Sequence, residues 1–187
     1  MDFFEFIQNV DISAVRFVRE HMACAFLDFV MPIITLLGED GVFWIAVTLF
    51  MLSFRRTRKG GFVMALSLIF GLLIGNLTLK PLIARPRPYV VDDGVYLLVD
   101  KLSDFSFPSG HTLACFEAAV SLLLVRYTKA GIAALILAFL VAFSRVYLYV
   151  HYPTDVIAGA LLGTLFAFVS CYIVNKIYGK VQKSETL

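Results

Sequence analysis

Successive apolar stretches constrain this chain more than any other feature of its sequence. They follow an N-terminal segment, at residues 22–38, 41–54, 61–83, 111–127, 130–150 and 154–178. A helix needs about 20 mostly apolar residues to cross a bilayer, so the last four stretches fit a span, and the first two fit one if flanking residues extend them. The chain is 60% hydrophobic and only 16% charged, which excludes an ordinary soluble domain. We predict an all-α, polytopic membrane protein with six transmembrane helices in one bundle.

The N-terminal segment, residues 1–21, has a different pattern. Phe and Ile residues are mixed there with Asp2, Glu5, Asp11, Arg16, Arg19 and Glu20. This mixture lacks the basic start and unbroken apolar run of a secretory signal, and it is typical of an amphipathic helix in the membrane interface. We therefore divide the chain into an N-terminal interfacial segment (1–21), a six-helix membrane domain (22–178) and a cytoplasmic tail (179–187).

The distribution of charge predicts how the spans are oriented. Basic residues gather in the loop 55–59, in residues 126–129 and near the C-terminus, whereas the loop 39–40 and the segment 84–110 carry the acidic residues between spans. Because cytoplasmic loops are enriched in Lys and Arg, six spans place both termini in the cytoplasm and the segment 84–110 on the outer face. An aromatic belt at the membrane interface is expected from Tyr147, Tyr149 and Tyr152.

Two further features exclude other classes of protein. The net charge is only +2 and the basic residues are scattered, so no nucleic-acid partner is expected. Cys24, Cys115 and Cys171 lie in apolar surroundings without a CxxC pair. This spacing indicates neither a disulfide framework nor a zinc site.

The remaining polar residues gather in three clusters, at residues 80–88, 106–111 and 144–155. In the predicted topology all three clusters lie at the outer face of the membrane. Two of the three histidines of the chain, His111 and His151, fall within them. We therefore expect one polar site at this face.

The clusters suit an anionic phosphoryl group. Ser109 is expected as the N-cap of the fourth span, with Gly110 and His111 in its first turn, where free N–H groups and the helix dipole attract anions. Gly110 has no side chain, so its amide can approach an oxygen atom closely. Lys80, Arg87 and Arg145 can supply positive charge. The guanidinium groups of the two arginines match the geometry of a phosphate.

The two histidines can supply the chemistry of phosphoryl transfer. His151 and Asp155 are four residues apart, the spacing that places side chains on one face of a helix. A carboxylate bonded to one imidazole nitrogen fixes the tautomer and leaves the other nitrogen free as a nucleophile. His111, at a helix start, is placed to protonate a leaving oxygen as general acid.

Three motifs together resemble the signature of the type 2 phosphatidic acid phosphatase family. They are Lys80-x6-Arg87-Pro88, Pro108-Ser109-Gly110-His111 and Ser144-Arg145-x5-His151-x3-Asp155. One of these motifs alone is a weak signal, but their order and spacing match across residues 25–178, with no departure at the motif positions. Members of this family are integral membrane lipid-phosphate phosphatases, related to vanadium haloperoxidases and bacterial acid phosphatases.

The resemblance assigns a role to each motif residue. It implies that His151 forms a phosphohistidine, that Asp155 orients His151, and that His111 is the acid. It implies neither a metal ion nor another cofactor. The phosphoryl oxygens would be held by Lys80, Arg87, Ser109, Gly110 and Arg145. Arg85 lies outside the signature, and a contribution to the positive field, a lipid-headgroup contact and simple solvation all fit it.

The resemblance also implies a phosphohydrolase of membrane lipids at the outer leaflet of the cell membrane, with a phosphorylated lipid and the bilayer as its partners. Undecaprenyl diphosphate is the favoured substrate, and phosphatidylglycerophosphate and phosphatidic acid are alternatives. A lipid phosphotransferase would share every motif residue and stays open. A phosphate-binding transporter is less favoured, because only scattered polar residues lie within the spans. These are Asp28, Asn76 and Glu117. The sequence does not indicate an oligomeric state.

Overall fold

The computed structural model of the chain describes residues 3–92 and 94–184, and every regular element in these residues is helical. The all-α prediction is thereby confirmed. A 3-10 turn, η1 (Glu39–Gly41), and a π-helical stretch, η2 (Gly71–Leu79), connect longer elements. The α-helices are α1 (Phe3–Met22), α2 (Ala25–Leu36), α3 (Val42–Ser53), α4 (Arg58–Phe70), α5 (Lys80–Ile83), α6 (Pro88–Val91), α7 (Gly110–Leu124), α8 (Thr128–Tyr147) and α9 (Pro153–Ser184).

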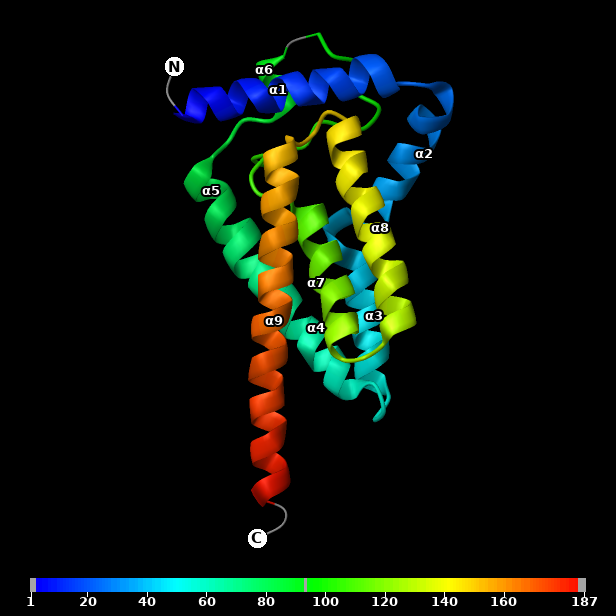
Figure 1. The fold of residues 1–187 in the computed structure, drawn as a ribbon, viewed down its shortest axis with the longest axis vertical. Helices are drawn as coiled ribbons and strands as arrows, with labels where there is room; N and C mark the ends of the chain where they lie inside the picture. Colours follow the sequence, from blue (N-terminus) through cyan, green and yellow to red (C-terminus); the bar gives the residue numbers. More distant parts are fainter. Residues whose placement is uncertain (1–2, 93, 185–187) are drawn as a thin grey trace.

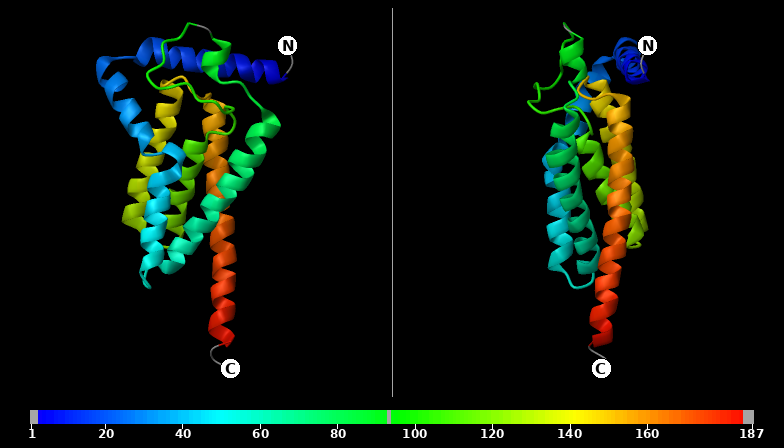
Figure 2. Two further views of the ribbon diagram at one scale, coloured as in Figure 1. Left: turned by 180° about the vertical axis from the view of Figure 1, so that it is seen from behind. Right: turned by 90° about the vertical axis from the view of Figure 1, so that its left-hand side faces the viewer.

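Length divides these helices into two groups. Three segments of the described chain are long and apolar enough to cross a membrane, namely Arg58–Val91, Thr128–Tyr147 and Pro153–Gly179. The apolar helices α2, α3 and α7 have only 12, 12 and 15 residues. A helix of 12 residues is about 18 Å long, well short of the roughly 30 Å of hydrocarbon in a bilayer. α2 and α3 lie end to end and lead in the same direction (Figures 1 and 2).

The predicted stretches 22–38 and 41–54 correspond to α2 and α3, and their assignment as two separate spans stays a prediction. The chain breaks between them at Gly38–Gly41, where Gly41 has a left-handed backbone (φ 66°) that interrupts the helix. The beginning of α1 and the end of α9 lie at opposite ends of the bundle (Figure 1). Hydropathy marks a helix break but does not show whether the chain turns back there.

The domain boundaries predicted after residues 21 and 178 stay predictions. α1 ends at Met22, and α9 continues to Ser184 without a break at residue 178. Residues 1–2 of the predicted interfacial segment and 185–187 of the predicted tail lie outside the described residues.

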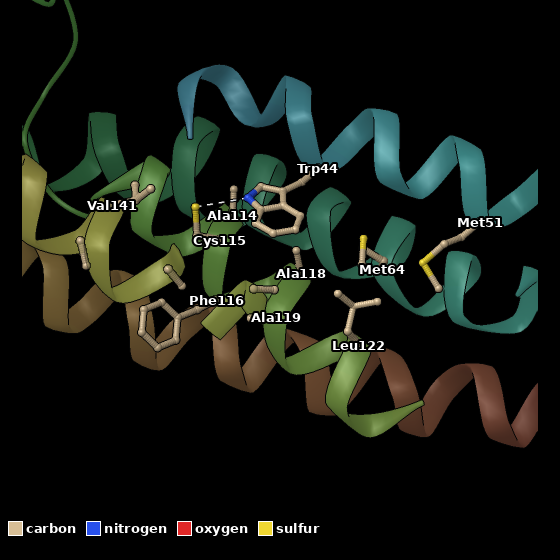
Figure 3. Close-up of a cluster of buried hydrophobic side chains, with 13 residues drawn as sticks. Trp44, Met51, Met64, Ala114, Cys115, Phe116, Ala118, Ala119, Leu122 and Val141 are labelled. Carbon is tan, nitrogen blue, oxygen red and sulfur yellow. Dashed lines mark hydrogen bonds between the residues drawn. The ribbon is translucent and has the colours of Figure 1, made fainter. Parts of the chain in front are cut away.

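α7 runs through the middle of the bundle and packs against α8 and α9 (Figure 1). The helices approach closely: a Cβ atom added at Gly163 of α9 would lie 2.5 Å from the carbonyl oxygen of Leu113. Trp44 of α3 and Met64 of α4 join the apolar core around α7 (Figure 3), and the Trp44 indole donates a hydrogen bond to Cys115 Sγ at 3.2 Å. Close approach at small residues is how helices associate within a membrane, and it holds the start of α7 in place.

α1 lies across the end of the bundle at which α8 ends and α9 begins (Figure 1). On its inner side Asp11 and Val15 are 2% and 0% exposed, whereas Phe4, Phe6 and Phe17 are exposed. Val15 belongs to an apolar cluster that includes residues 146–150 of α8 and the turn after it. The N-terminal helix therefore covers the α8–α9 turn.

The aromatic belt predicted for Tyr147, Tyr149 and Tyr152 is wrong, because none of these tyrosines is more than 2% exposed. Their hydroxyl groups take part in hydrogen bonds of 2.5–2.8 Å inside the protein, with Asp28, Asp92 and Gln8 respectively. The sequence placed these residues at the correct end of the bundle but did not show that other elements cover them.

Candidate active site

One cavity of about 960 Å³ collects most of the predicted site residues. It lies between α3, α4, η2 and α7, and its polar end is lined by Lys80, Arg87, Gly110, His111, Arg145 and His151. Most of the other lining residues are apolar, among them Ile45, Leu49, Leu68, Ile69 and Leu72. The structure thus brings residues from all three sequence clusters to one end of a largely apolar cavity.

His151 lies in the turn between α8 and α9, so it precedes the helix that carries Asp155 rather than sharing a helical face with it. The turn is tight: Tyr149 has a left-handed backbone (φ 64°), and the His151 amide donates to the Arg145 carbonyl at 3.2 Å. His151 is 1% exposed. The α9 helix begins at Pro153, a residue whose fixed φ favours a helix start.

The two ring nitrogens of His151 face different groups. Nδ1 lies 3.5 Å from Asp155 Oδ2 and 3.4 Å from the Ser106 hydroxyl, which itself donates to Asp155. Nε2 lies 3.3 Å from Arg87 Nη1. Burial lowers the pKa of His151 to about 3, and the positive charges of Arg145 and Arg87 act in the same direction, against the effect of Asp155. The imidazole is therefore neutral at pH 7, as a nucleophile must be.

Lys80 and Arg87 meet at the carboxylate of Asp104, which accepts hydrogen bonds from both. Arg87 is fixed further by donating to the Val150 carbonyl at 2.8 Å and to the Asp104 carbonyl at 2.9 Å. Burial raises the pKa of Asp104, but the two cations lower it more, to about 2. Asp104 is therefore an ionised carboxylate, about half exposed, that faces two of the residues predicted to bind phosphate.

Arg145 is 3% exposed, yet most of its guanidinium has no partner. Nη1 donates to the Thr35 hydroxyl at 2.6 Å, but Nε and Nη2 make no hydrogen bond within the described residues. A buried donor without a partner costs about 1–3 kcal/mol, more when it is charged. Because Arg145 lines the cavity, these donors suit an anion bound there.

The start of α7 presents only part of the predicted anion site. Ser109 is the N-cap residue, but its hydroxyl makes no capping bond and lies 3.0 Å from the Thr112 hydroxyl. Gly110 and His111, not Ser109, line the cavity. A Cβ atom at Gly110 would come within 2.8 Å of Asn76 Oδ1, so glycine is what fits here. The phosphate-binding role of Ser109 stays a prediction.

Sequence reasoning missed several contacts of this site. The sequence shows Asp104 only as an acidic residue of the outer segment, and nothing in it indicates the hydrogen bond from Ser106 to Asp155. Arg85 donates to Asp155 Oδ1 at 2.6 Å, so neither headgroup contact nor solvation describes it. The clustering of Arg85 with the motif residues was the available signal. Within the described residues no group of three His, Cys, Asp or Glu side chains could hold a metal ion.

Comparison with known proteins places this geometry in a family. The chain is 39% identical over 181 residues to an undecaprenyl-diphosphatase of Sulfolobus acidocaldarius, covering 96% of this chain and 86% of the relative. It is 35% identical over 152 residues to phosphatidylglycerophosphatase B of Bacillus subtilis, covering 75% of this chain and 66% of that relative. The similarity to the first relative thus extends over nearly all of this chain and most of that protein.

Solved structures agree with the sequence comparison. A Bacillus subtilis transmembrane PAP2-type phosphatidylglycerolphosphate phosphatase has a TM-score of 0.74 and 32% identity, covering 91% of this chain and 87% of that one. LpxE of Aquifex aeolicus has a TM-score of 0.76 and 27% identity, covering 86% of this chain and 94% of that one. The sequence profile of the PAP2 superfamily matches residues 60–178, which include all three motifs. The resemblance predicted from the motifs is confirmed, and the chain belongs to the PAP2 superfamily.

Proposed function

We propose that this chain hydrolyses undecaprenyl diphosphate through a phosphohistidine formed on His151. The observation that carries the proposal is the position of His151: buried and neutral, it lies between the Asp155 carboxylate and Arg87 at the polar end of an otherwise mostly apolar cavity. A phosphate group at that end and a hydrocarbon chain along the rest of the cavity match a phosphorylated lipid. The undecaprenyl-diphosphatase relative supports this choice of lipid.

The reaction would proceed in two displacements. His151 Nε2 attacks the terminal phosphorus, an N–P bond forms, and the P–O bond to undecaprenyl phosphate breaks while His111 donates a proton to the leaving oxygen. Water then gives a proton to His111 and attacks the phosphohistidine, releasing inorganic phosphate and free His151. Lys80, Arg87 and Arg145 would stabilise the charge that develops on the phosphoryl oxygens.

The membrane placement is also part of the proposal. The described helices make passes at α2–α3, α4–α5, α7, α8 and α9. The basic loop 55–59 and residues 126–129 lie at the end of the bundle away from the candidate site, and excess Lys and Arg favour the cytoplasm. We infer that the site opens at the outer leaflet, with α1 in the outer interface and the end of α9 in the cytoplasm. This proposal places α1 at the outer face, whereas the charge distribution of the sequence predicts a cytoplasmic N-terminus.

Phosphate release from a panel of substrates tests the function. Purified protein in detergent is given undecaprenyl diphosphate, phosphatidylglycerophosphate, phosphatidic acid and dimethylallyl diphosphate, which carries the same diphosphate on five carbons. We expect the highest kcat/KM on undecaprenyl diphosphate. The value for dimethylallyl diphosphate should be at least about 100-fold lower, because most of the apolar contact is lost.

Histidine variants provide the matched control for this panel. His151→Ala should release no phosphate, whereas His21→Ala, which removes an exposed histidine of α1, should retain wild-type rates. Highest efficiency on phosphatidylglycerophosphate would favour the alternative substrate, which the Bacillus subtilis relatives support. Phosphate release by His151→Ala at wild-type rates would contradict the mechanism.

A further inference from the structure

Arg85 uses all of its hydrogen-bonding capacity inside the protein. Nη1 donates to Asp155 Oδ1 at 2.6 Å and to the Thr154 hydroxyl at 2.8 Å. Nη2 donates to Asp11 Oδ2 and to Gln8 Oε1, both at 2.7 Å, and Nε donates to Gln8 at 3.2 Å. A guanidinium has five N–H groups, so none is left for a substrate. Arg85 is also absent from the lining of the cavity.

Two of these partners come from α1, a helix outside residues 60–178, the part that matches the family profile. Asp11, 2% exposed, also accepts hydrogen bonds from the amide and the hydroxyl of Thr154. Gln8 Nε2 donates to the Tyr152 hydroxyl at 2.8 Å, and the Arg85 guanidinium lies 3.9 Å from the centre of the Tyr152 ring. α1 therefore contacts the segment 152–155 directly, and Arg85 forms a second connection because it bonds to both α1 and this segment.

The connection ends at the carboxylate that faces His151. Asp155 is fully buried, and its two oxygens have separate partners. Oδ1 accepts from Arg85. Oδ2 faces His151 Nδ1 and accepts from the Ser106 hydroxyl and from the Tyr152 amide at 3.0 Å. Rotation of the carboxylate would break the Arg85 contact. Arg85 thus holds Oδ1, and together with the two donors on Oδ2 it determines which oxygen the imidazole meets.

We propose that Arg85, held by Asp11 and Gln8 of α1, is a positioning residue that fixes Asp155 and through it the ring of His151, so that the N-terminal helix is part of the active site. The role in turnover rests on the proposed function, since it acts on the histidine that would attack phosphorus. Loss of the positioning should lower kcat and leave KM nearly unchanged, because neither Arg85 nor Asp11 lines the cavity.

Variants of Asp11 and Gln8 in α1 and of Arg85 test the proposal, and Asp11→Asn among them keeps the shape of the side chain. Asp11→Asn and Gln8→Ala weaken the hold on Arg85, and Arg85→Gln removes the contact to Asp155. We expect kcat to fall on the order of 10- to 100-fold, the range seen when an outer partner of a functional ligand is removed, with KM within about twofold. Asp11→Glu should restore part of the loss. Arg16→Gln is the matched control, because Arg16 ties the same helix to Asp92 at 2.7 Å and makes no contact with Asp155.

A second measurement does not depend on any substrate. In protein labelled with ¹⁵N-histidine, with His151→Ala to assign the signal, Asp11→Asn and Arg85→Gln should shift or broaden the His151 ring resonances, and Arg16→Gln should not. If the wild type hydrolyses no lipid of the panel, the proposed function fails while these spectra still decide the positioning role. Unchanged ring resonances in Asp11→Asn and Arg85→Gln would overturn the inference. So would a kcat within twofold of wild type, or an equal loss of kcat in Arg16→Gln.

Discussion

The arginines of the candidate site differ in what their donors contact. Arg85 is saturated by protein groups, and Arg87 directs one donor at Asp104, a half-exposed carboxylate that an anion could replace. Arg145 keeps Nε and Nη2 without partners although it is 3% exposed. The three arginines therefore have different roles. Arg145 has the most donors free to bind a phosphoryl group.

Replacing Arg145 should therefore weaken catalysis strongly. Arg145→Gln removes two donors aimed at the developing charge, and we expect kcat for phosphate release to fall on the order of 10²- to 10³-fold, as for loss of one oxyanion donor. Arg126→Gln, at an exposed arginine away from the cavity, serves as the control and should stay within twofold of wild type. A fall of less than about threefold in Arg145→Gln would show that Arg145 does not contact the transition state.

At the same scale, sequence alone predicted the motif residues that gather around the cavity, because their types are those that phosphate chemistry requires. It did not predict the partners of these residues. Asp11 and Arg85 are 74 positions apart, and no periodicity or spacing connects them. Asp104 resembles any other acidic loop residue until the fold brings Lys80 and Arg87 against it.

Among the elements, the starts and ends of the apolar helices are predictable from hydropathy and breakers. The expected spans 111–127, 130–150 and 154–178 correspond to α7 (110–124), α8 (128–147) and the apolar part of α9. The first two stretches, 22–38 and 41–54, likewise contain α2 and α3. The direction of the chain after the break between them is not predictable, since Gly38–Gly41 has the glycines and acidic residues of a loop between spans. In the structure, Gly38 and Gly41 line the cavity, so this break serves the site.

Cysteine labelling tests the orientation of α1 and of the pass that follows it. Cys24 is exposed where α1 meets α2, at the same end of the bundle as the candidate site. We expect a membrane-impermeant maleimide to label it on intact cells, and Cys24→Ser to abolish that label. In the Cys24→Ser background, Arg56→Cys should be labelled only after permeabilisation, because loop 55–59 lies at the other end. Labelling of Arg56→Cys, but not of Cys24, on intact cells would reverse the proposed orientation.

Over the whole molecule, α1 and the polar site share one end, while the loops 55–59 and 126–129 occupy the other (Figure 1). Asp92 belongs to the first end because it pairs with Arg16 of α1, and Asp104 because it pairs with Lys80 and Arg87. The cavity extends from the polar end between helices whose lining is mostly apolar. A substrate held in this cavity would have its phosphate at the polar end and its hydrocarbon chain between the helices. In the proposed reaction, Nε2 of His151 is the atom that takes up phosphorus.

Detection of the phosphorylated residue during turnover tests that claim most directly. Undecaprenyl diphosphate labelled with ³²P in its terminal phosphate is mixed with the enzyme and quenched rapidly in alkali, which preserves a phosphorus–nitrogen bond, and the labelled peptide is then mapped. We predict label on His151 that is lost in acid and is absent from His151→Ala. Label on another residue, or phosphate release without any labelled protein, would contradict the account.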